Sequence, residues 1–162
     1  MIEFKKITLY KMNLKLQEPF EISSARITHR PILLCECEDK EGVVVWSECV
    51  AKGIPNYSPE IIDTAWIIIK SHLAPLLLNK SFKTPQAISL ELNKWVKGNL
   101  MAKAALEMAA WTVAATKKNQ SLAQYIGGIK STIPSGLSIG LQPSNEVLVN
   151  KVKEAISEGY QK

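Results

Sequence analysis

Cysteine is scarce in this sequence. Its 162 residues include only Cys35, Cys37 and Cys49, and none of them form a Cys-x-x-Cys pair. A small, odd number of cysteines without that spacing excludes a disulfide framework and a cysteine zinc site. We therefore expect reduced cysteines in the core, as is usual in a cytoplasmic protein.

Long hydrophobic runs are also missing. The longest uninterrupted apolar segments, residues 65–69 and 73–78, are far shorter than the roughly 20 residues that span a membrane. The first residues contain neither an apolar signal-peptide core nor a small-residue cleavage site. We expect no contact with a membrane.

Strong charge of one sign is absent as well. Lysine and arginine total 20 against 15 acidic residues, which leaves a net charge of +5. The basic residues are scattered, no run of them reaches four, and they do not alternate with aromatic residues. We therefore predict a solvated surface and no nucleic-acid partner, while a small anionic substrate would suit the basic balance.

The 46% of hydrophobic residues suffices for one ordinary domain or slightly more. Alternating apolar and polar residues predict a strand over residues 2–16, and the pattern is lost over residues 17–30, which we interpret as a loop. Two further apolar runs, residues 31–37 and 43–49, are separated by a turn that ends in Gly42. The first 50 residues thus predict a three-stranded antiparallel meander.

Helix-start signals follow the predicted strands. A Ser-Pro-Glu sequence at residues 58–60, with the serine as N-cap, predicts a helix over residues 61–72. Thr84 and Pro85 repeat this signal for a helix that ends near Val96.

An alanine-rich helix is predicted next. Asn99 would open it, and it would cover residues 100–116 and pack closely on several sides. Lys103 and Glu107 share one of its faces, which predicts a surface ion pair. A short helix over residues 121–126 would end at a pair of glycines.

The last part of the chain has a different organisation. Residues 133–139 form a short apolar run that predicts a buried strand, and Ser144 would cap a helix that ends at Gly159. Such a helix normally leads to a neighbouring parallel strand, but only residues 160–162 follow it. The predicted strand has no ladder partner, so the sequence looks cut at the start of a larger α/β domain.

Three motifs resemble a known family. They are Trp-Ser-Glu-Cys at residues 46–49, MAKAALEMAAW at residues 101–111, and IPSGLSIG at residues 133–140 followed by Glu-Gly-Tyr at 158–160. The sequence is similar to the o-succinylbenzoate synthase and N-acylamino acid racemase group of the enolase superfamily, which is related to mandelate racemase and muconate lactonizing enzyme. The second motif is the most specific to this group.

The resemblance implies an α+β fold with two parts. Residues 1–128 would form an enolase-type N-terminal capping domain, made of a three-stranded antiparallel meander and a helical bundle. Residues 129–162 would form the first β/α unit of a (β/α)7β barrel, a TIM-like barrel that is incomplete in this sequence.

The resemblance also implies chemistry on a small carboxylate. In this family a base removes the proton α to a carboxylate, and Mg²⁺ in the full-length enzyme stabilises the enediolate. The synthase uses this chemistry for a dehydration in menaquinone biosynthesis, and the racemase uses it to invert an α-carbon. The family's catalytic lysines and metal ligands lie on later barrel strands. We therefore expect no catalytic residue and no metal ligand in these 162 residues, and no activity from this chain alone.

Substrate contacts are a separate expectation from the resemblance. Two loops of the family's cap close over the substrate, and their counterparts here are residues 18–30 and 51–57. Phe20 and Ile54 would form apolar walls, and Ser138 would hydrogen-bond a substrate carboxylate. The alternatives are loop side chains that pack on their own domain and a serine that bonds to backbone.

Two other readings of the function stay open. The chain could belong to a racemase-like isomerase, or it could be a non-catalytic truncated cap that acts as a folding or interaction module. We also expect self-association, because an unpaired β/α unit exposes apolar surface and a strand edge.

Overall fold

The computed structural model describes residues 1–23 and 25–162, and the chain groups into two compact units. The first, here called the sheet–helix unit, contains Met1–Asn13 and Pro31–Gly128. The second, here called the hairpin–helix unit, contains Leu14–Arg30 and Ile129–Lys162. The units are described separately, and the predicted division into domains at residue 128 stays a prediction.

The sheet confirms the predicted meander and adds a short strand. Within the described residues its order is β3-β2-β1-β4, with β2 antiparallel to β3 and β1 antiparallel to β4. The strands are β1 (Ile2–Ile22), β2 (Ala25–Asp39), β3 (Val44–Cys49) and β4 (Ser81–Phe82). The strand β4 pairs only at Ile2 and Glu3, and a two-residue strand is too short to produce a sequence pattern.

The loop predicted over residues 17–30 is wrong for most of its length. The strand β1 continues to Ile22 and β2 begins at Ala25, while residue 24 lies outside the described residues. Most side chains of this hairpin are exposed. Backbone pairing between strands needs no apolar face, so a strand with solvent on both faces lacks the alternation that predicts it.

The first predicted helix extends beyond the predicted residues 61–72. It comprises α1 (Ile62–Ile68), the π-helical turn η1 (Ile69–Leu73) and α2 (Ala74–Leu77). Ser58 is not its N-cap, contrary to the prediction. The helix begins after Ile61, and the Thr64 hydroxyl both accepts from the Ile61 N–H and donates to its carbonyl.

The other predicted helices of this unit are confirmed. They are α3 (Pro85–Trp95), α4 (Leu100–Lys117) and α5 (Leu122–Tyr125). The side chains of Thr84 and Ser121 accept hydrogen bonds from the first turns of α3 and α5. Local capping chemistry therefore determines where these two helices begin.

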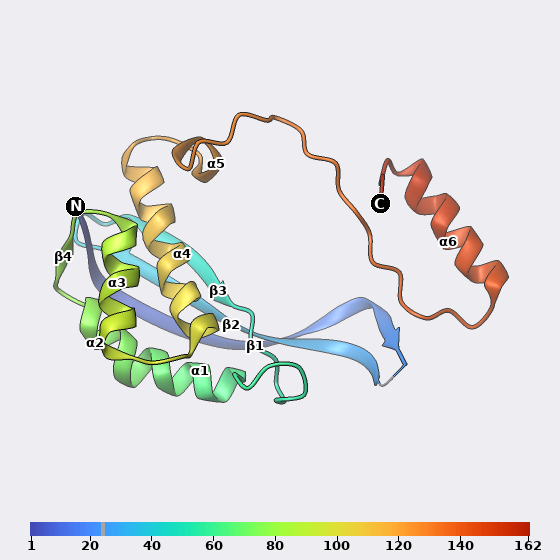
Figure 1. Cartoon of the computed structure of the whole chain (residues 1–162), viewed down its shortest axis with the longest axis horizontal. Helices are drawn as coiled ribbons and strands as arrows, with labels where there is room; N and C mark the ends of the chain where they lie inside the picture. The colour runs from blue at the N-terminus through green and yellow to red at the C-terminus, as the bar shows by residue number, and fades with distance from the viewer. Residues whose placement is uncertain (24) are drawn as a thin grey trace. The chain divides into compact units, whose positions relative to one another are not determined.

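The core of the sheet–helix unit lies between the sheet and its helices. Figure 1 shows α3 and α4 side by side across one face of the sheet, and α4 packs on both β3 and α3. Five alanines of α4 are almost inaccessible: Ala102, Ala105, Ala109, Ala110 and Ala115. Their small side chains allow the close packing that the alanine-rich sequence predicts.

The predicted ion pair between Lys103 and Glu107 is wrong. Lys103 is only 6% exposed, and its Nζ donates to Asn93 Oδ1 at 2.8 Å and to the Val96 carbonyl at 2.5 Å. Glu107 instead accepts from the Ser89 hydroxyl at 3.1 Å. Each side chain contacts α3 or the residue that ends it, and spacing along one helix cannot reveal such a neighbour. Burial lowers the pKa of Lys103.

The hairpin–helix unit contains the predicted C-terminal helix. It is α6 (Asn145–Ser157), and the Ser144 hydroxyl accepts from the Val147 N–H, as the sequence predicts. None of the helices in residues 1–23 and 25–162 is both long and apolar enough to cross a membrane.

The buried strand predicted over residues 133–139 is wrong for this structure. The segment has no strand assignment and is mostly exposed, because it lacks neighbours that would cover its apolar side chains. It does have a partner, contrary to expectation. The Leu137 N–H donates to the Lys162 carbonyl at 2.8 Å, and the Gln161 N–H donates to the Ser135 carbonyl at 3.2 Å.

Candidate functional site

A hollow of about 350 Å³ lies within the hairpin–helix unit. Three segments line it: residues 17–20 of β1, the stretch 137–142, and one side of α6. Phe20 and Ser138, two of the three residues predicted to contact substrate, are both in its lining. A hollow of this size matches a small organic ligand rather than a macromolecule.

Polar contacts hold the hairpin on the stretch that follows Ser138. The Leu141 N–H donates to the Glu21 carbonyl at 2.8 Å. Lys151 on α6 forms an ion pair with Glu18 of the hairpin. These contacts join segments far apart in the sequence, and they explain how Phe20 reaches the hollow.

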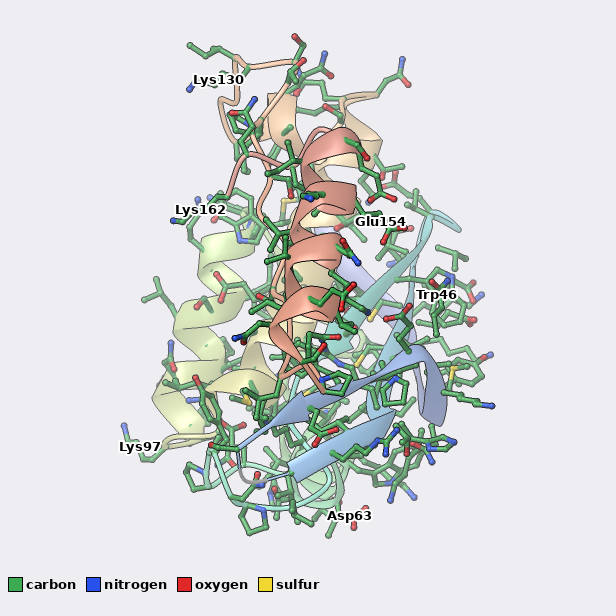
Figure 2. The ribbon with its side chains drawn as sticks, turned by 90° about the vertical axis from the view of Figure 1, so that its right-hand side faces the viewer. Trp46, Asp63, Lys97, Lys130, Glu154 and Lys162 are labelled. Atoms are coloured by element: carbon green, nitrogen blue, oxygen red, sulfur yellow. The ribbon has the colours of Figure 1, made fainter. Side chains whose placement is uncertain are left out.

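The charged groups of the lining are mostly acidic. Lys151 provides a cation, and Glu18, Glu154 and Glu158 provide carboxylates; Figure 2 labels Glu154 on α6. Lys151 is already paired with Glu18. Beside this neutral pair, Glu154 and Glu158 leave the lining with a net negative charge, next to the apolar surface of Phe20 and the hydroxyl and amide groups of Ser138 and Gln142.

Ser138 is exposed in this structure. The residue also belongs to the lining of the hollow, as a ligand contact requires. The alternative of a buried serine that bonds to backbone does not describe this environment.

Ile54 lies in the other unit. It belongs to the loop that follows β3, and its side chain is 60% exposed. In the same loop the Lys52 Nζ lies 4.6 Å from the centre of the Tyr57 ring. The predicted role of Ile54 stays a prediction.

The described residues contain neither a cluster that could hold a metal ion nor an ionised thiol among Cys35 and Cys37. No three histidine, cysteine, aspartate or glutamate side chains among them lie close enough together to hold a metal ion. Cys35 and Cys37 are fully buried, and burial raises the pKa of each thiol to about 12. These thiols are therefore protonated at neutral pH and poor nucleophiles. The titratable acids of the hollow are the carboxylates of Glu18, Glu154 and Glu158.

Sequence reasoning missed Lys151 and Gln142 in the lining, and it gave Glu18 only as the first residue of the predicted loop 18–30. Gln142 donates from its Nε2 to the Gly140 carbonyl at 2.9 Å, which orders the stretch after Ser138. Lys151 and Glu18 carry no local signal, since a charged residue on a helix or a hairpin is ordinarily solvated. Only their proximity in space marks them.

Comparison with known proteins defines the class. Residues 5–127 match the N-terminal domain of the mandelate racemase / muconate lactonizing enzyme family, and the chain belongs to this family. The resemblance of the sequence to the enolase superfamily is thereby confirmed, and so is the α+β capping fold.

Two relatives show the range of activities in the group. The o-succinylbenzoate synthase of Bacillus subtilis is 37% identical over 162 residues, which is 100% of this chain and 43% of the relative. The N-succinylamino acid racemase of Thermus thermophilus is 32% identical over 161 residues, which is 99% of this chain and 42% of the relative. The chain thus spans less than half the length of these relatives.

Solved structures agree with the fold. An enolase superfamily member from Listeria innocua has a TM-score of 0.89 and 36% identity, with 99% of this chain and 43% of that chain covered. The 2-chloromuconate cycloisomerase of Rhodococcus opacus has a TM-score of 0.88 at 23% identity, which shows the fold alone.

Proposed function

We propose that this chain forms the substrate-enclosing part of an o-succinylbenzoate synthase-like enzyme. The reaction would be abstraction of the proton α to a carboxylate, assisted by a metal, followed by dehydration, as in menaquinone biosynthesis. The observation that carries the proposal is the shared hollow, in which Phe20 and Ser138 come together from segments far apart in the sequence. The similarity to synthases over the whole chain supports the same reading.

Three residues have binding roles in this proposal. Phe20 provides an apolar wall, and Ser138 donates a hydrogen bond to the substrate carboxylate. Ile54 provides a second wall from the loop after β3. A hydroxyl donor beside an aromatic surface suits a substrate that is part carboxylate and part hydrocarbon.

Catalysis itself is assigned outside the described residues. Because these residues offer no metal site, Mg²⁺ belongs to the proposal only as a requirement of the full-length enzyme. We therefore propose that the 162-residue chain alone binds a small carboxylate but does not convert it. We also propose that the protein is localised in the cytoplasm.

A racemase-like isomerase is the second candidate. The relative in Thermus thermophilus is named N-succinylamino acid racemase and matches almost all of this chain. Both reactions begin with the same proton abstraction, so the same binding residues would serve either. A non-catalytic interaction module is the third candidate, and activity measurements separate it from the other two.

A chimeric enzyme tests the proposal. This chain would replace the corresponding 43% of the Bacillus subtilis synthase, and dehydration and N-succinyl amino acid racemisation would be measured with added magnesium. We expect turnover by the chimera and none by the 162-residue chain. A folded chimera without either activity would contradict the proposal, and turnover by the chain alone would contradict its inactivity.

Alanine variants of the chimera test the binding roles. We expect Phe20→Ala, Ile54→Ala and Ser138→Ala each to raise KM about tenfold, equivalent to about 1.4 kcal/mol, with a smaller change in kcat. Val44→Ala and Ser131→Ala remove exposed side chains outside the hollow and serve as matched controls. Equal KM values for the test and control variants would refute the assigned roles.

A further inference from the structure

The hairpin approaches residue 140 more closely than a side chain would allow. A Cβ atom added to Gly140 would lie 2.7 Å from the Glu21 carbonyl oxygen, 3.1 Å from the Glu21 nitrogen and 3.3 Å from Phe20 Cδ2. Separations below 3.0 Å essentially never occur for real Cβ atoms. The obstacle is backbone, which cannot rotate aside as a flexible side chain does.

Glycine is not required here by the backbone conformation. Gly140 is absent from the glycines with positive φ, so an alanine could adopt its backbone angles without that strain. The close approach of the hairpin is thus the structural reason for glycine at this position. An alanine substitution would test that contact separately from the local backbone.

Two further contacts fix the hairpin at the same place. The next residue, Leu141, donates its N–H to the Glu21 carbonyl at 2.8 Å. Lys151 pairs with Glu18, two residues before Phe20. The first contact depends directly on the distance between Gly140 and Glu21, whereas the second is an exposed ion pair of small energy.

We propose that Gly140 is a positioning residue that determines how far Phe20 stands from Ser138 across the hollow. This inference rests on the proposed function, because the spacing matters for substrate only if the hollow binds it. The missing side chain lets the hairpin dock, and the docked hairpin sets the largest group that fits beside Phe20. An alanine would move the hairpin outward, break the bond between Leu141 and Glu21, and admit bulkier substrates.

A second glycine provides a matched control. A Cβ on Gly136 would lie 2.9 Å from the Lys162 carbonyl oxygen, and Leu137 donates its N–H to that same oxygen. Gly136 also lacks a positive φ. At both glycines a Cβ would lie closer than 3.0 Å to a backbone oxygen, which belongs to Glu21 of the hairpin at Gly140 and to Lys162 at Gly136.

Hydrogen exchange on the 162-residue chain tests docking without any substrate. We expect Gly140→Ala to speed exchange of the Leu141 amide at least tenfold and to leave the Leu137 amide unchanged. Gly136→Ala should have the reverse effect. Unchanged exchange at Leu141 in Gly140→Ala, or the same response of both amides to both variants, would overturn the docking role.

The ion pair provides a rescue experiment. Glu18→Lys should loosen the hairpin and speed exchange at Leu141 by a few fold, and adding Lys151→Glu should restore most of the lost protection. A double variant no better protected than the single one would show that this pair does not hold the hairpin.

Substrate selectivity in the chimera tests whether Gly140 limits the size of the group that fits beside Phe20. We expect Gly140→Ala to shift the ratio of kcat/KM for a bulky over a small N-succinyl amino acid about fivefold toward the bulky one, mainly through KM. Normal selectivity together with faster exchange at Leu141 would overturn the specificity role while leaving docking intact. The chimera could be inactive while Gly140→Ala speeds exchange only at Leu141 and Gly136→Ala only at Leu137. That result would count against the proposed function and not against docking.

Discussion

The two units of this chain treat their apolar side chains in opposite ways. In the sheet–helix unit, Phe4, Leu33 and Leu106 are completely inaccessible and belong to one continuous core. In the hairpin–helix unit, Ala155 is the buried hydrophobic residue among those described. Large apolar side chains of α6 remain exposed: Val147, Leu148, Val149, Val152 and Ile156.

The contrast shows that a predicted amphipathic helix does not by itself imply a core. Both α4 and α6 have the apolar spacing that predicts packing, and both begin where the sequence indicates. Burial of apolar surface contributes about 25 cal/mol per Å², so α4 gains stability that α6 does not. We infer that the sheet–helix unit stabilises itself, while α6 needs contacts from elsewhere.

Core truncation should give the largest difference between the units. Leu106→Ala removes a fully buried side chain and should lower the free energy of unfolding by about 3 kcal/mol. Ile156→Ala removes a side chain that is 65% exposed and should change it by less than about 0.5 kcal/mol. Urea denaturation followed by circular dichroism measures both, and similar losses would invalidate the comparison.

Substitution of the buried carboxylate of Asp39 should give the second-largest loss of unfolding free energy. Asp39 is inaccessible, pairs with Lys117, and accepts the N–H groups of Glu41 and Val43 at 2.9 Å each. Burial alone would raise the pKa of Asp39, but Lys117 and these two N–H groups together outweigh burial and hold that pKa below its ordinary value of 3.8. We expect Asp39→Asn to cost about 2 kcal/mol at pH 7, because the charge-assisted bonds are lost.

The ion pair between Asp39 and Lys117 also predicts that folding stability depends on pH. Since the pKa of Asp39 is lower in the folded state, its stabilisation is complete above pH 3.8 and is lost as the pH falls through the folded value. Denaturation at several pH values between about 2 and 7 would reveal this contribution. The difference between wild type and Asp39→Asn should shrink in acid, and a constant difference would contradict the assignment. Asp63→Asn, in an exposed pair with Lys11, is the control and should have little effect.

Self-association is the next prediction and concerns the exposed side of α6. We propose that this surface associates with other copies of the chain, because its apolar side chains are uncovered. Replacing Val152 and Ile156 with glutamate should weaken association at least tenfold in analytical ultracentrifugation. Leu90→Glu, at a 72% exposed position of α3, is the control. A wild-type chain that stays monomeric at high concentration would refute the proposal.

Helix caps should give the smallest effects. The Glu60 carboxylate accepts from the Met101 and Ala102 N–H groups at the start of α4, so Glu60→Ala should cost about 1 kcal/mol of global stability. Ser144→Ala removes the cap of α6 and should reduce only local helicity. Thermal denaturation and residue-level exchange distinguish the two. A similar loss of global stability from Ser144→Ala would show that α6 shares the main core.

Features encoded in short segments could be predicted from the sequence. The alanine-rich helix, the caps at Thr84 and Ser144 and the strands around Gly42 all depend on neighbours a few residues away. The motif at residues 101–111 also indicated the family, which the comparisons show. Local propensity and capping are sufficient for such features.

Features that depend on distant contacts could not be predicted in this way. The exposed hairpin has no alternation, and Glu60 caps a helix that begins about 40 residues later in the chain. Lys103 turns inward because α3 ends beside it. In each case the deciding partner lies outside the window in which sequence patterns carry information.

The sequence by itself determined the presence of the main helices, the meander and the family, and it singled out two residues that line the hollow. Only the tertiary structure decided that Phe20 and Ser138 line one hollow and that the hairpin docks at Gly140. Lys151 and Glu18, which pair across this docking contact, are 133 positions apart in the chain. The physical reason is that composition and periodicity record each residue's preference, whereas a site depends on which distant segments the folded backbone brings within contact distance.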